Sequence, residues 1–405
     1  MDASSEGGDH DLAPNDILFD TNPFSLNFHP TEDMVVVSDA EGRVKLYKYS
    51  VDENETKLSL RPHRSGCRQA SFSSDGKYIF TASSDHSMKV IDINTGSILY
   101  TREDAHDDAI NCLVSRDFML FTGDDEGTIK VWDMRQQNIV CEFQEHGDYI
   151  SDISTLDDKH IVATSGDGGV SIYNFVRHSM DDISEKSDNE LLSVIPLDND
   201  QKLVCGSQDG TIFIYDRQNL ESPKKFVGHP QSVDTLVKVN NQTFFSGSSD
   251  GIIRYIGLQP KKLLGIVGEH SQFPVERMAL SRDNRYLGSI SHDFTLKFWN
   301  VSSFYEENDD DEDNSLQQTA TGGENSVFKS DDEEDDEDEE NEQDEEMDDS
   351  DDDSDDDEDE DEDTSSDEDI KPVNKPKKTG PQFTQTQGDR QKKSQQQKKN
   401  FYSDL

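Results

Sequence analysis

One short phrase recurs seven times within the first 301 residues, and its even spacing constrains the fold more than any other feature of the chain. Each copy contains small residues, an acidic residue, a turn-forming residue and then an alternating, strand-like run that ends in an aromatic residue or Ile. The acidic residues of successive copies lie 41–44 residues apart: Glu41, Asp85, Glu126, Asp167, Asp209, Asp250 and Asp293. Self-similarity at a fixed period predicts a repeat architecture, in which each copy is one supersecondary unit.

The length of the period and the ending of the copies indicate the kind of repeat. A period of about 40–45 residues with a terminal Trp-Asp pair is typical of the WD repeat, whose copies each fold as four antiparallel strands. Trp132-Asp133 is the full ending, and Trp299 occupies the same place in the last copy. Seven copies predict an all-β fold, a seven-bladed WD-repeat β-propeller over residues 15–303, preceded by a disordered N-terminus over residues 1–14.

A histidine precedes most of the repeat acids by 20–23 residues, just ahead of a new strand: His63, His106, His146, His229 and His270. In WD repeats, such a His and the turn acid join a buried hydrogen-bond network with a strand hydroxyl and the Trp. A buried imidazole and a buried carboxylate are each costly alone and stabilise the fold when paired. We therefore expect these five histidines, the seven repeat acids, Trp132 and Trp299 to be structural, and not catalytic or metal-binding. The fifth copy lacks the His, because residues 185–187 (Glu-Lys-Ser) take its place.

The two ends of the repeat region predict how the ring closes. The seventh copy ends at Trp299-Asn300, and an acidic run begins within a few residues, so no fourth strand follows. The N-terminal run over residues 15–20 has strand character. We expect it to supply the outer strand of the last blade, which removes an exposed sheet edge.

Positions just after the repeat histidines are expected on the rim of the ring, where propellers bind peptides or proteins: Asp107, Asp108, Asp148, Gln231 and Gln272. A small basic group lies in the second copy, and we interpret it as a solvated surface: Arg61, Arg64 and Arg68.

The charge of the chain is divided sharply along its length. The formal net charge is −51, of which −20 falls on residues 1–301. Residues 331–370 hold 31 acidic side chains and no basic one, whereas residues 371–405 hold nine Lys and Arg against two Asp. Self-repulsion and missing apolar surface exclude a core from the acidic tract 304–370, which we predict to be disordered, as is the basic Lys/Gln-rich tail 371–405. The negative charge of the propeller disfavours direct nucleic-acid binding by it.

The acidic tract has two interpretations. It is either a solubilising tail or a polyanion that screens highly basic partners such as ribosomal proteins or histones. Four serines within it are followed by acidic residues and are candidate sites for an acidophilic kinase: Ser330, Ser350, Ser354 and Ser366. Each phosphate would add about −1.5 to −2 charge, which favours a graded effect on partner binding over a switch.

The C-terminal tail contains short basic clusters that are typical of a nuclear import signal: Lys371, Lys375, Lys377, Lys378, Lys392, Lys393, Lys398 and Lys399. Contact with RNA and plain solvation are the alternatives.

Several function classes find no support in the sequence. The four cysteines are widely spaced, which indicates a reduced intracellular compartment and no structural zinc site: Cys67, Cys112, Cys141 and Cys205. No stretch approaches the roughly 18–20 apolar residues of a membrane span, and the polar, acidic N-terminus is unlike a signal peptide. No phosphate-binding loop, zinc-protease or serine-hydrolase motif is present, so we predict no enzyme and no cofactor.

Five segments of the repeat region resemble the WD repeat-containing protein 55 family: residues 22–30 (NPFSLNFHP), 122–135 (TGDDEGTIKVWDMR), 145–153 (EHGDYISDI), 247–254 (GSSDGIIR) and 289–299 (SISHDFTLKFW). Glu126 in place of the usual turn Asp is shared with the third blade of that family. The resemblance implies a nuclear, mainly nucleolar scaffold protein in ribosome biogenesis, involved in ribosomal RNA production or processing. Pre-ribosomal or assembly factors would be its partners.

Two other functions remain open. Trp132-Asp133-Met134-Arg135 matches the W-D-x-R ending of many substrate receptors of cullin-ring ubiquitin ligases, in which the Arg contacts the adaptor. Arg suits this contact because it can clamp a carboxylate bidentately. The alternative for Arg135 is a strand end that points to solvent. The acidic tract suggests the other function, a chaperone for histones or ribosomal proteins.

Overall fold

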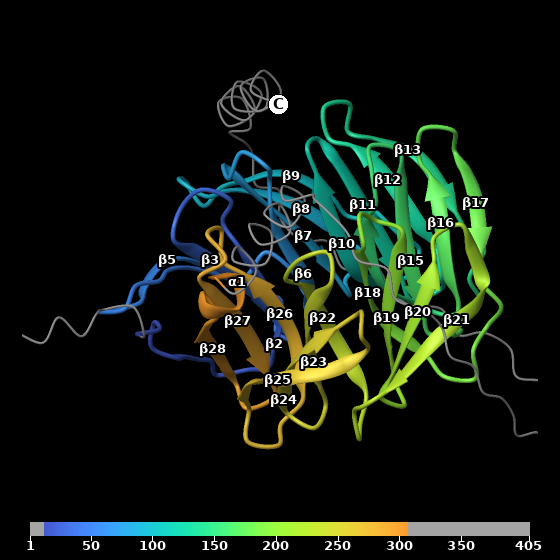
Figure 1. Cartoon of the computed structure of the whole chain (residues 1–405). Helices are drawn as coiled ribbons and strands as arrows, with labels where there is room; N and C mark the ends of the chain where they lie inside the picture. Colours follow the sequence, from blue (N-terminus) through green and yellow to red (C-terminus); the bar gives the residue numbers. More distant parts are fainter. Residues whose placement is uncertain (1–11, 307–405) are drawn as a thin grey trace, which may run out of the picture. The chain divides into compact units, whose positions relative to one another are not determined.

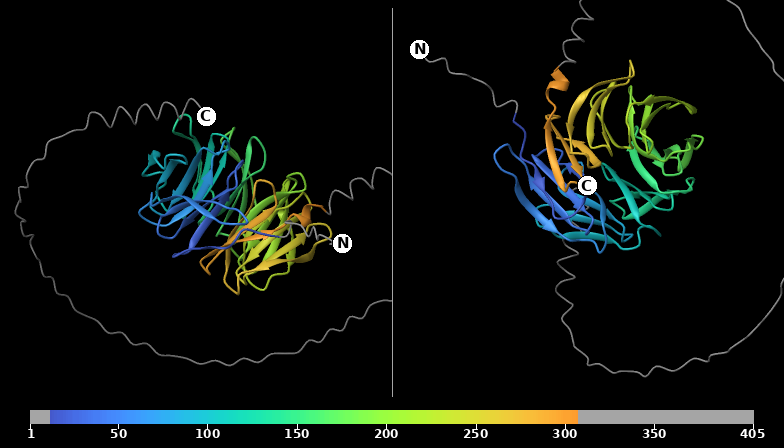
Figure 2. Two further views of the ribbon diagram at one scale, coloured as in Figure 1. Left: turned by 90° about the vertical axis from the view of Figure 1, so that its left-hand side faces the viewer. Right: turned by 90° about the horizontal axis from the view of Figure 1, so that it is seen from below.

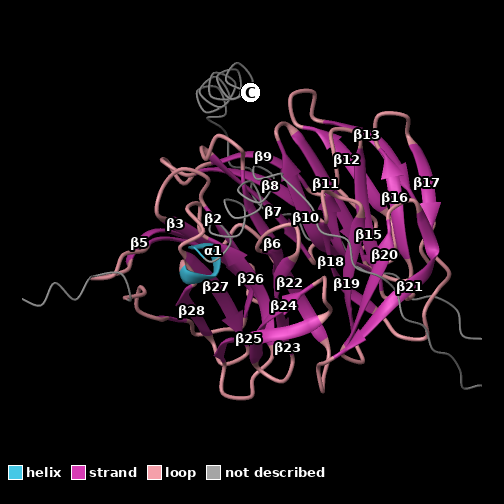
Figure 3. Ribbon diagram, in the orientation of Figure 1, coloured by secondary structure: helices cyan, strands magenta, loops and turns pink. Residues whose placement is uncertain are grey.

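The computed structural model describes residues 12–306, which form seven four-stranded antiparallel sheets arranged in a ring (Figures 1 and 2). The predicted seven-bladed β-propeller is thereby confirmed. Apart from one short helix, the regular secondary structure of the described residues is all strand (Figure 3). Residues 1–11 and 307–405 lie outside the described residues. The predictions for most of the N-terminus, for nearly all of the acidic tract with its candidate phosphorylation sites, and for the basic tail with its import signal therefore concern residues outside the described part.

Each of the first four blades runs from an inner strand to an outer strand in chain order. Blade 1 comprises β2 (Pro23–Phe28), β3 (Met34–Asp39), β4 (Val44–Lys48) and β5 (Glu55–Leu60). Blade 2 comprises β6 (Cys67–Phe72), β7 (Tyr78–Ser83), β8 (Met88–Asp92) and β9 (Ile98–Arg102). Blade 3 comprises β10 (Ile110–Arg116), β11 (Met119–Asp124), β12 (Ile129–Asp133) and β13 (Asn138–Phe143). Blade 4 comprises β14 (Ile150–Thr155), β15 (His160–Ser165), β16 (Val170–Asn174) and β17 (Ser179–Ile183).

The last three blades complete the ring. Blade 5 comprises β18 (Leu191–Leu197), β19 (Lys202–Ser207), β20 (Thr211–Asp216) and β21 (Asn219–Val227). Blade 6 comprises β22 (Val233–Lys238), β23 (Thr243–Ser248), β24 (Ile252–Gly257) and β25 (Lys262–Glu269). Blade 7 comprises β26 (Val275–Leu280), β27 (Tyr286–Ser291), β28 (Thr295–Asn300) and β1 (Ile17–Leu18). A short helix, α1 (Ser303–Glu306), follows β28, and no helix of residues 12–306 is long and apolar enough to cross a membrane.

The alternating strand directions give the ring two distinct faces. The loops that lead into the inner strands and the turns between the second and third strands lie on one face, which we call the entry face. The turns between the first and second strands and between the third and fourth strands lie on the opposite face, which we call the exit face. The repeat histidines and acids belong to entry-face loops, and α1 follows a third strand onto the exit face.

The first strand of the chain closes the ring. Ile17 and Leu18 of β1 pair antiparallel with Leu296 and Thr295 of β28. The backbone N–H of Phe19 continues the ladder by donating to the carbonyl oxygen of Phe294 over 2.8 Å. Ile17 is buried in the apolar cluster between blades 7 and 1. The blade is therefore completed by residues far away in sequence, which ties the two ends of the propeller together.

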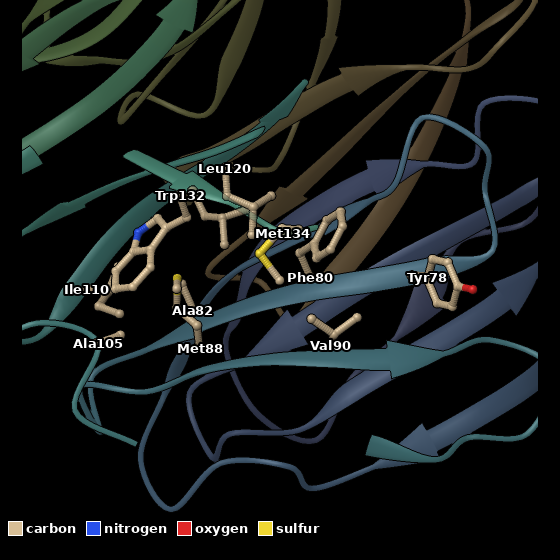
Figure 4. Packing of buried hydrophobic residues seen from close by; sticks show 11 residues of the cluster. Tyr78, Phe80, Ala82, Met88, Val90, Ala105, Ile110, Leu120, Trp132 and Met134 are labelled. Carbon is tan, nitrogen blue, oxygen red and sulfur yellow. The ribbon is translucent and has the colours of Figure 1, made fainter. Parts of the chain in front are cut away.

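The apolar core lies between neighbouring blades rather than within one of them. In the cluster between blades 2 and 3, Phe80 and Val90 from one blade pack against Trp132 and Met134 from the next (Figure 4). Trp132 is among the largest fully buried side chains of the described residues. Because each sheet buries both faces against its neighbours, the strands read as near-continuous apolar runs, and area removed from water is the main stabilising term.

Side chains of the inner strands add hydrogen bonds from blade to blade. Ser25 Oγ accepts from the backbone N–H of Ala70 over 2.9 Å, which links blade 1 to blade 2. Thr235 Oγ1 accepts from the backbone N–H of Met278 over 3.2 Å, which links blade 6 to blade 7. These two hydroxyl groups are thus satisfied by the adjacent blade, which helps to fix the relative register of the sheets.

Removing β1 should destabilise the whole propeller. Deletion of residues 1–19 takes away the β28 pairing and the buried Ile17, at a cost of about 2–4 kcal/mol, and it exposes a sheet edge. We expect the melting temperature of the entire domain to fall by several degrees in calorimetry. Deletion of residues 1–11 alone is the matched control and should leave the melting temperature unchanged. Equal melting temperatures for the two deletions would show that β1 does not hold the ring closed.

Candidate functional site

The repeat histidines lie in buried hydrogen-bond networks, and blade 3 shows the full arrangement. Trp132 Nε1 donates to Thr122 Oγ1 over 2.9 Å, and His106 Nε2 lies 2.7 Å from the same oxygen. His106 Nδ1 lies 2.7 Å from a carboxylate oxygen of Asp124. Burial lowers the pKa of His106. The ring is therefore neutral near pH 7, with Nδ1 donating to the carboxylate and Nε2 accepting the threonine hydroxyl proton.

Blade 7 repeats this arrangement. Trp299 Nε1 donates to Ser289 Oγ over 2.7 Å, His270 Nε2 lies 2.7 Å from that oxygen, and His270 Nδ1 lies 2.8 Å from Asp293. Blade 2 has the same network without a Trp, and blade 4 has a variant of it in which the hydroxyl comes from the third strand. In them, His63 bridges Thr81 and Asp85 and His146 bridges Ser171 and Asp167. These groups are occupied in holding the entry-face loops to the sheets.

Blade 3 corrects the prediction that Glu126 belongs to this network. The carboxylate bound to His106 is that of Asp124, two residues earlier, and Glu126 is exposed. Asp124 Oδ1 also accepts from the backbone N–H groups of Thr128 and Glu126, over 2.7 and 3.1 Å. The short Asp side chain at the end of β11 reaches the imidazole and the turn together, so the Glu is left on the surface.

The same two-residue shift occurs in blade 1, where Glu41 was the predicted turn acid. Asp39 is buried and accepts from the backbone N–H groups of Glu41 and Arg43, both over 2.9 Å. Glu41 is exposed and pairs with the Arg43 side chain. In both blades an Asp at the end of the second strand replaces the Asp that the other blades carry within the turn.

Blades 5 and 6 depart from the predicted network in another way. His229 Nε2 lies 2.9 Å from Ser246 Oγ, but Asp250 does not reach this His, because both of its oxygens are bound by Arg254 at 3.0 and 2.6 Å. Burial and the nearby Arg254 charge lower the pKa of His229 to about 4. In blade 5, which lacks the His, Asp209 binds its own turn through Ser207 and the following backbone.

The corrected assignment can be tested by comparing two acidic residues of one turn. Asp124→Ala leaves the buried His106 without its partner and frees two turn N–H groups, so we expect a loss of about 3 kcal/mol in unfolding free energy. Glu126→Ala, the matched control, removes an exposed carboxylate and should change the stability by less than about 0.5 kcal/mol. Denaturant titration of both variants measures the difference. A larger loss for Glu126→Ala would restore the assignment made from the sequence.

A cup of about 450 Å³ opens at the centre of the entry face, where the inner strands begin. Each inner strand has a bulge at its second residue, because the pairing register shifts between the first and third residues in every blade. Bulges re-aim side chains and are common beside functional sites. The seven bulged residues, one from each blade, all line the cup: Phe24, Arg68, Asn111, Ser151, Leu192, Asp234 and Glu276.

Three acidic groups line this cup, two of them on neighbouring blades and one across the ring. Asp234 and Glu276 come from the adjacent blades 6 and 7, and Asp125 lines the cup from blade 3. Burial, with Glu276 nearby, raises the pKa of Asp234. Glu276 also pairs with His292 of its own blade. The cup therefore presents carboxylates that are only partly compensated by neighbouring positive charge.

An ion pair crosses the centre of the ring below these residues. Arg277 of blade 7 lies 3.7 Å from Asp152 of blade 4, and it donates to the carbonyl oxygen of Ser151 over 3.4 Å. Asp152 also accepts from the backbone N–H of Val194 in blade 5, over 3.0 Å. Because Arg277 reaches across the centre, the inner end of the cup is polar. The ion pair there joins blades 7 and 4.

Two aromatic side chains complete the lining. Tyr149 donates its hydroxyl to Glu190 over 2.7 Å and packs on Gly166, where a Cβ would come within 2.3 Å of the Tyr149 ring, so only Gly fits there. Across the cup, the Arg68 guanidinium lies 5.5 Å from the centroid of the Phe24 ring. The cup thus combines charged, amide, hydroxyl and aromatic groups, which suits the side chains of a protein partner.

Sequence reasoning missed this set of residues. None of the predicted rim residues lines the cup, and Arg68, interpreted as part of a solvated surface, does. A signal was nevertheless present. The cup residue follows the repeat His by five positions in blades 2, 3, 4 and 6 and by six in blade 7. Aligning the copies on the His rather than on the turn acid identifies the bulged positions.

Arg135, the Arg of the W-D-x-R ending, is held within its own turn on the exit face. Its Nε and Nη2 donate to the two carboxylate oxygens of Asp133 over 3.1 and 2.8 Å, and its guanidinium stacks on Phe118 at 3.3 Å from the ring centroid. Its side chain is still 44% exposed. Beside it lies a pocket of about 420 Å³ with apolar walls that include Phe118, Val140 and Val176.

Within residues 12–306, no group of three or more His, Cys, Asp or Glu is arranged to hold a metal ion. The four cysteines are free thiols. Burial raises the pKa of Cys141 to about 11 and also raises the pKa of Cys67, Cys112 and Cys205. These thiols are therefore protonated at neutral pH and are poor nucleophiles.

Comparison with known proteins places this geometry in a family. Residues 14–304 match the family model WDR55, which covers the whole described propeller. The chain belongs to the WDR55 family. It is 84% identical over 309 residues to the WD repeat-containing protein 55 homolog of Dictyostelium discoideum, covering 76% of both chains. It is 35% identical over 294 residues to WD repeat-containing protein 55 of Homo sapiens, covering 71% of this chain and 77% of that one.

A fungal WDR55 relative carries a different name. The chain is 37% identical over 306 residues to WD repeat-containing protein JIP5 of Cryptococcus neoformans, covering 71% of this chain and 82% of that one. The predicted resemblance to the WD repeat-containing protein 55 family, including its fungal member, is thus confirmed. WDR55 proteins are WD-repeat propellers, a class of fold that typically serves as a non-catalytic scaffold for protein interactions.

Proposed function

We propose that this WDR55 protein is a non-enzymatic scaffold of the nucleolus that acts in ribosome biogenesis, in the production or processing of ribosomal RNA. Pre-ribosomal or assembly factors would dock on the propeller. Family membership supports the proposal, together with the basic clusters of residues 371–405, which are typical of nuclear import signals.

The central cup carries the docking part of this proposal. One bulged residue from each of the seven blades faces it, so the ring builds a single site that no blade could form alone. Its partly compensated carboxylates and the −20 charge of residues 1–301 disfavour phosphate groups. They favour a protein partner that presents a basic or hydrogen-bonding side chain.

The experiment is affinity purification of the tagged protein from cells at about 0.15 M salt, where the Debye length is about 8 Å, followed by mass spectrometry. Full-length protein, residues 1–306 fused to a separate nuclear import signal, and the full-length double variant Asp234→Asn/Glu276→Gln are compared. We expect pre-ribosomal factors with the first two, and a loss of at least about tenfold with the double variant, the usual effect of removing a central interface contact.

A second double variant controls for the loss of two negative charges. Asp107→Asn/Glu145→Gln neutralises two exposed carboxylates of the same face outside the cup and should retain the factors. Equal recovery with both double variants would exclude the cup as the docking site. Absence of pre-ribosomal factors from the full-length sample, or an extranucleolar location of the tagged chain in microscopy, would exclude the ribosomal role.

Arg135 supports a second candidate, a substrate receptor of a cullin-ring ligase. Its guanidinium is oriented by Asp133 and partly exposed beside an apolar pocket, an arrangement that an adaptor can contact. Under this proposal Arg135→Ala abolishes co-purification of the ligase adaptor. Arg64→Ala, which removes an Arg that is 84% exposed on the other face, leaves it intact. Recovery of the adaptor with Arg135→Ala, or its absence from the wild-type sample, would exclude this function.

A further inference from the structure

Four exposed lysines form one surface where the outer strands of blades 5 and 6 meet. Lys224 and Lys225 belong to β21, Lys261 lies in the turn before β25, and Lys262 begins β25. Lys261 Nζ donates to the carbonyl oxygen of Lys225 over 3.1 Å, so the turn of blade 6 lies against the outer strand of blade 5. We call these four residues the basic strip.

The lysines of the basic strip differ from seven of the eleven other lysines of residues 12–306 in having no carboxylate within ion-pair distance. None of the four pairs with a carboxylate in residues 12–306, although Lys225 lies 5.1 Å from the centroid of the Phe213 ring. Seven other lysines do form ion pairs with carboxylates: Lys45, Lys57, Lys77, Lys89, Lys130, Lys186 and Lys202. In a domain whose net charge is −20, four neighbouring lysines without acidic partners are a localised attraction for anions.

Apolar side chains stand exposed on the same two strands. Val227 of β21 and Leu263, Leu264 and Ile266 of β25 are between 41% and 77% exposed. Gly265, between them, has open space around its Cβ position. Singly exposed apolar residues are normal, but a group of them beside a basic strip marks an interaction surface.

The described residues end in α1, which packs on blade 6, the blade that carries Lys261 and Lys262. Phe304 of α1 packs on Tyr255 of β24 with 4.8 Å between ring centroids, and on Phe245 of β23 with 5.5 Å. Tyr255 pairs across the ladder with Gly265, and two residues further along β24 the pairing ends at Gly257 and Lys262. The helix α1 therefore packs on blade 6 from the side of blade 7, and the strip begins on the next strand of that sheet, with Lys262 of β25 and the exit-face turn that carries Lys261.

The residues that follow α1 are strongly acidic, so their charge is opposite to that of the basic strip. Residues 307–313 (Glu-Asn-Asp-Asp-Asp-Glu-Asp) contain six acidic side chains in seven positions. At up to about 3.4 Å per residue, seven residues can span at most roughly 24 Å from the end of α1, which is about five times the spacing of roughly 4.8 Å between neighbouring strands. A short tether raises its effective concentration at the strip to the millimolar range or higher.

We propose that the acidic segment 307–313 docks in cis on the basic strip of blades 5 and 6. Its carboxylates replace the acidic partners that the propeller itself does not supply to the four lysines. Because the pairs are solvent-exposed, the contact is reversible and weakens with salt. The docked segment blocks the binding of other polyanions to the strip. The acidic residues 307–313 therefore regulate access to the four lysines. The proposal is independent of the nucleolar role and of the cup.

Zero-length carbodiimide cross-linking of the full-length protein tests the contact directly, because it joins only amines and carboxylates that touch. We expect peptides that join the strip lysines to residues 307–313 in the monomer band at about 0.05 M salt. Their yield should fall several-fold at about 1 M salt, where the Debye length is near 3 Å. Lys48 and Lys159, exposed lysines elsewhere on the propeller, are the internal controls and should join this segment in much lower yield.

The positions of the cross-links show which segment, if any, occupies the basic strip. Peptides that join the strip chiefly to residues 331–370, cross-links found only between two chains, or no strip cross-link at low salt would each overturn the proposal. Variants add a second measurement. Replacing the six acids of residues 307–313 by Asn and Gln should increase the affinity of a labelled polyglutamate peptide for the chain several-fold.

A matched variant with six acids replaced within residues 355–360 has the same charge change and should bind the polyglutamate peptide as the wild type does. Replacing the four strip lysines by Gln should remove the gain in affinity. Equal affinities for the two tail variants, or a gain that survives loss of the four lysines, would show that segment 307–313 does not cover the strip.

Discussion

Ring closure through β1 is the constraint on which the rest of the propeller depends. A sheet blade buries its apolar side chains only against neighbours on both sides, so an open ring would expose two blade faces and a strand edge. Pairing of Ile17 with Leu296 closes that gap with residues that are separated by most of the domain. Phe294 holds a left-handed backbone with φ of +62°, a position that is Gly in five other blades, while its carbonyl accepts the Phe19 N–H. The closure thus tolerates a bulky residue at a strained turn, which costs about 1–2 kcal/mol.

In a closed ring, the bulged residues of all seven inner strands point toward the same central cup. Each bulge turns one side chain toward the axis, and seven of them converge only because the blades are held at fixed angles. The ion pair between Arg277 and Asp152 joins blades 7 and 4 through the centre, so the lining of the cup is itself part of the bracing. Stability and binding therefore share residues at the axis, whereas the histidine networks brace each blade separately.

The fold and the site differ in how far the sequence predicts them. Even spacing of seven copies predicts the blade number and the architecture, because the repeat period reflects a backbone unit. The roles of individual side chains are predicted less well. Asp124 and Asp39 make the contacts that the alignment of the repeats assigned to Glu126 and Glu41. A sequence pattern does not distinguish two acidic residues that lie two positions apart. In the folded blade, only one of the two carboxylates can bind the turn. Arg254 captures Asp250 from His229 for a similar reason, because a bidentate charged partner competes better than a neutral ring.

Charge is distributed over the two faces in a way that separates their roles. Carboxylates line the cup on the entry face, where Asp234 and Glu276 come from adjacent blades and burial raises the pKa of Asp234. The strand β28 runs from the entry face to the exit face, so α1 and the acidic residues after it are attached on the side opposite the cup. At physiological ionic strength, charges more than about 8 Å apart are largely screened. Fixed charges on the two faces of the described propeller therefore act separately, so the cup and the basic strip are two independent candidates for docking surfaces.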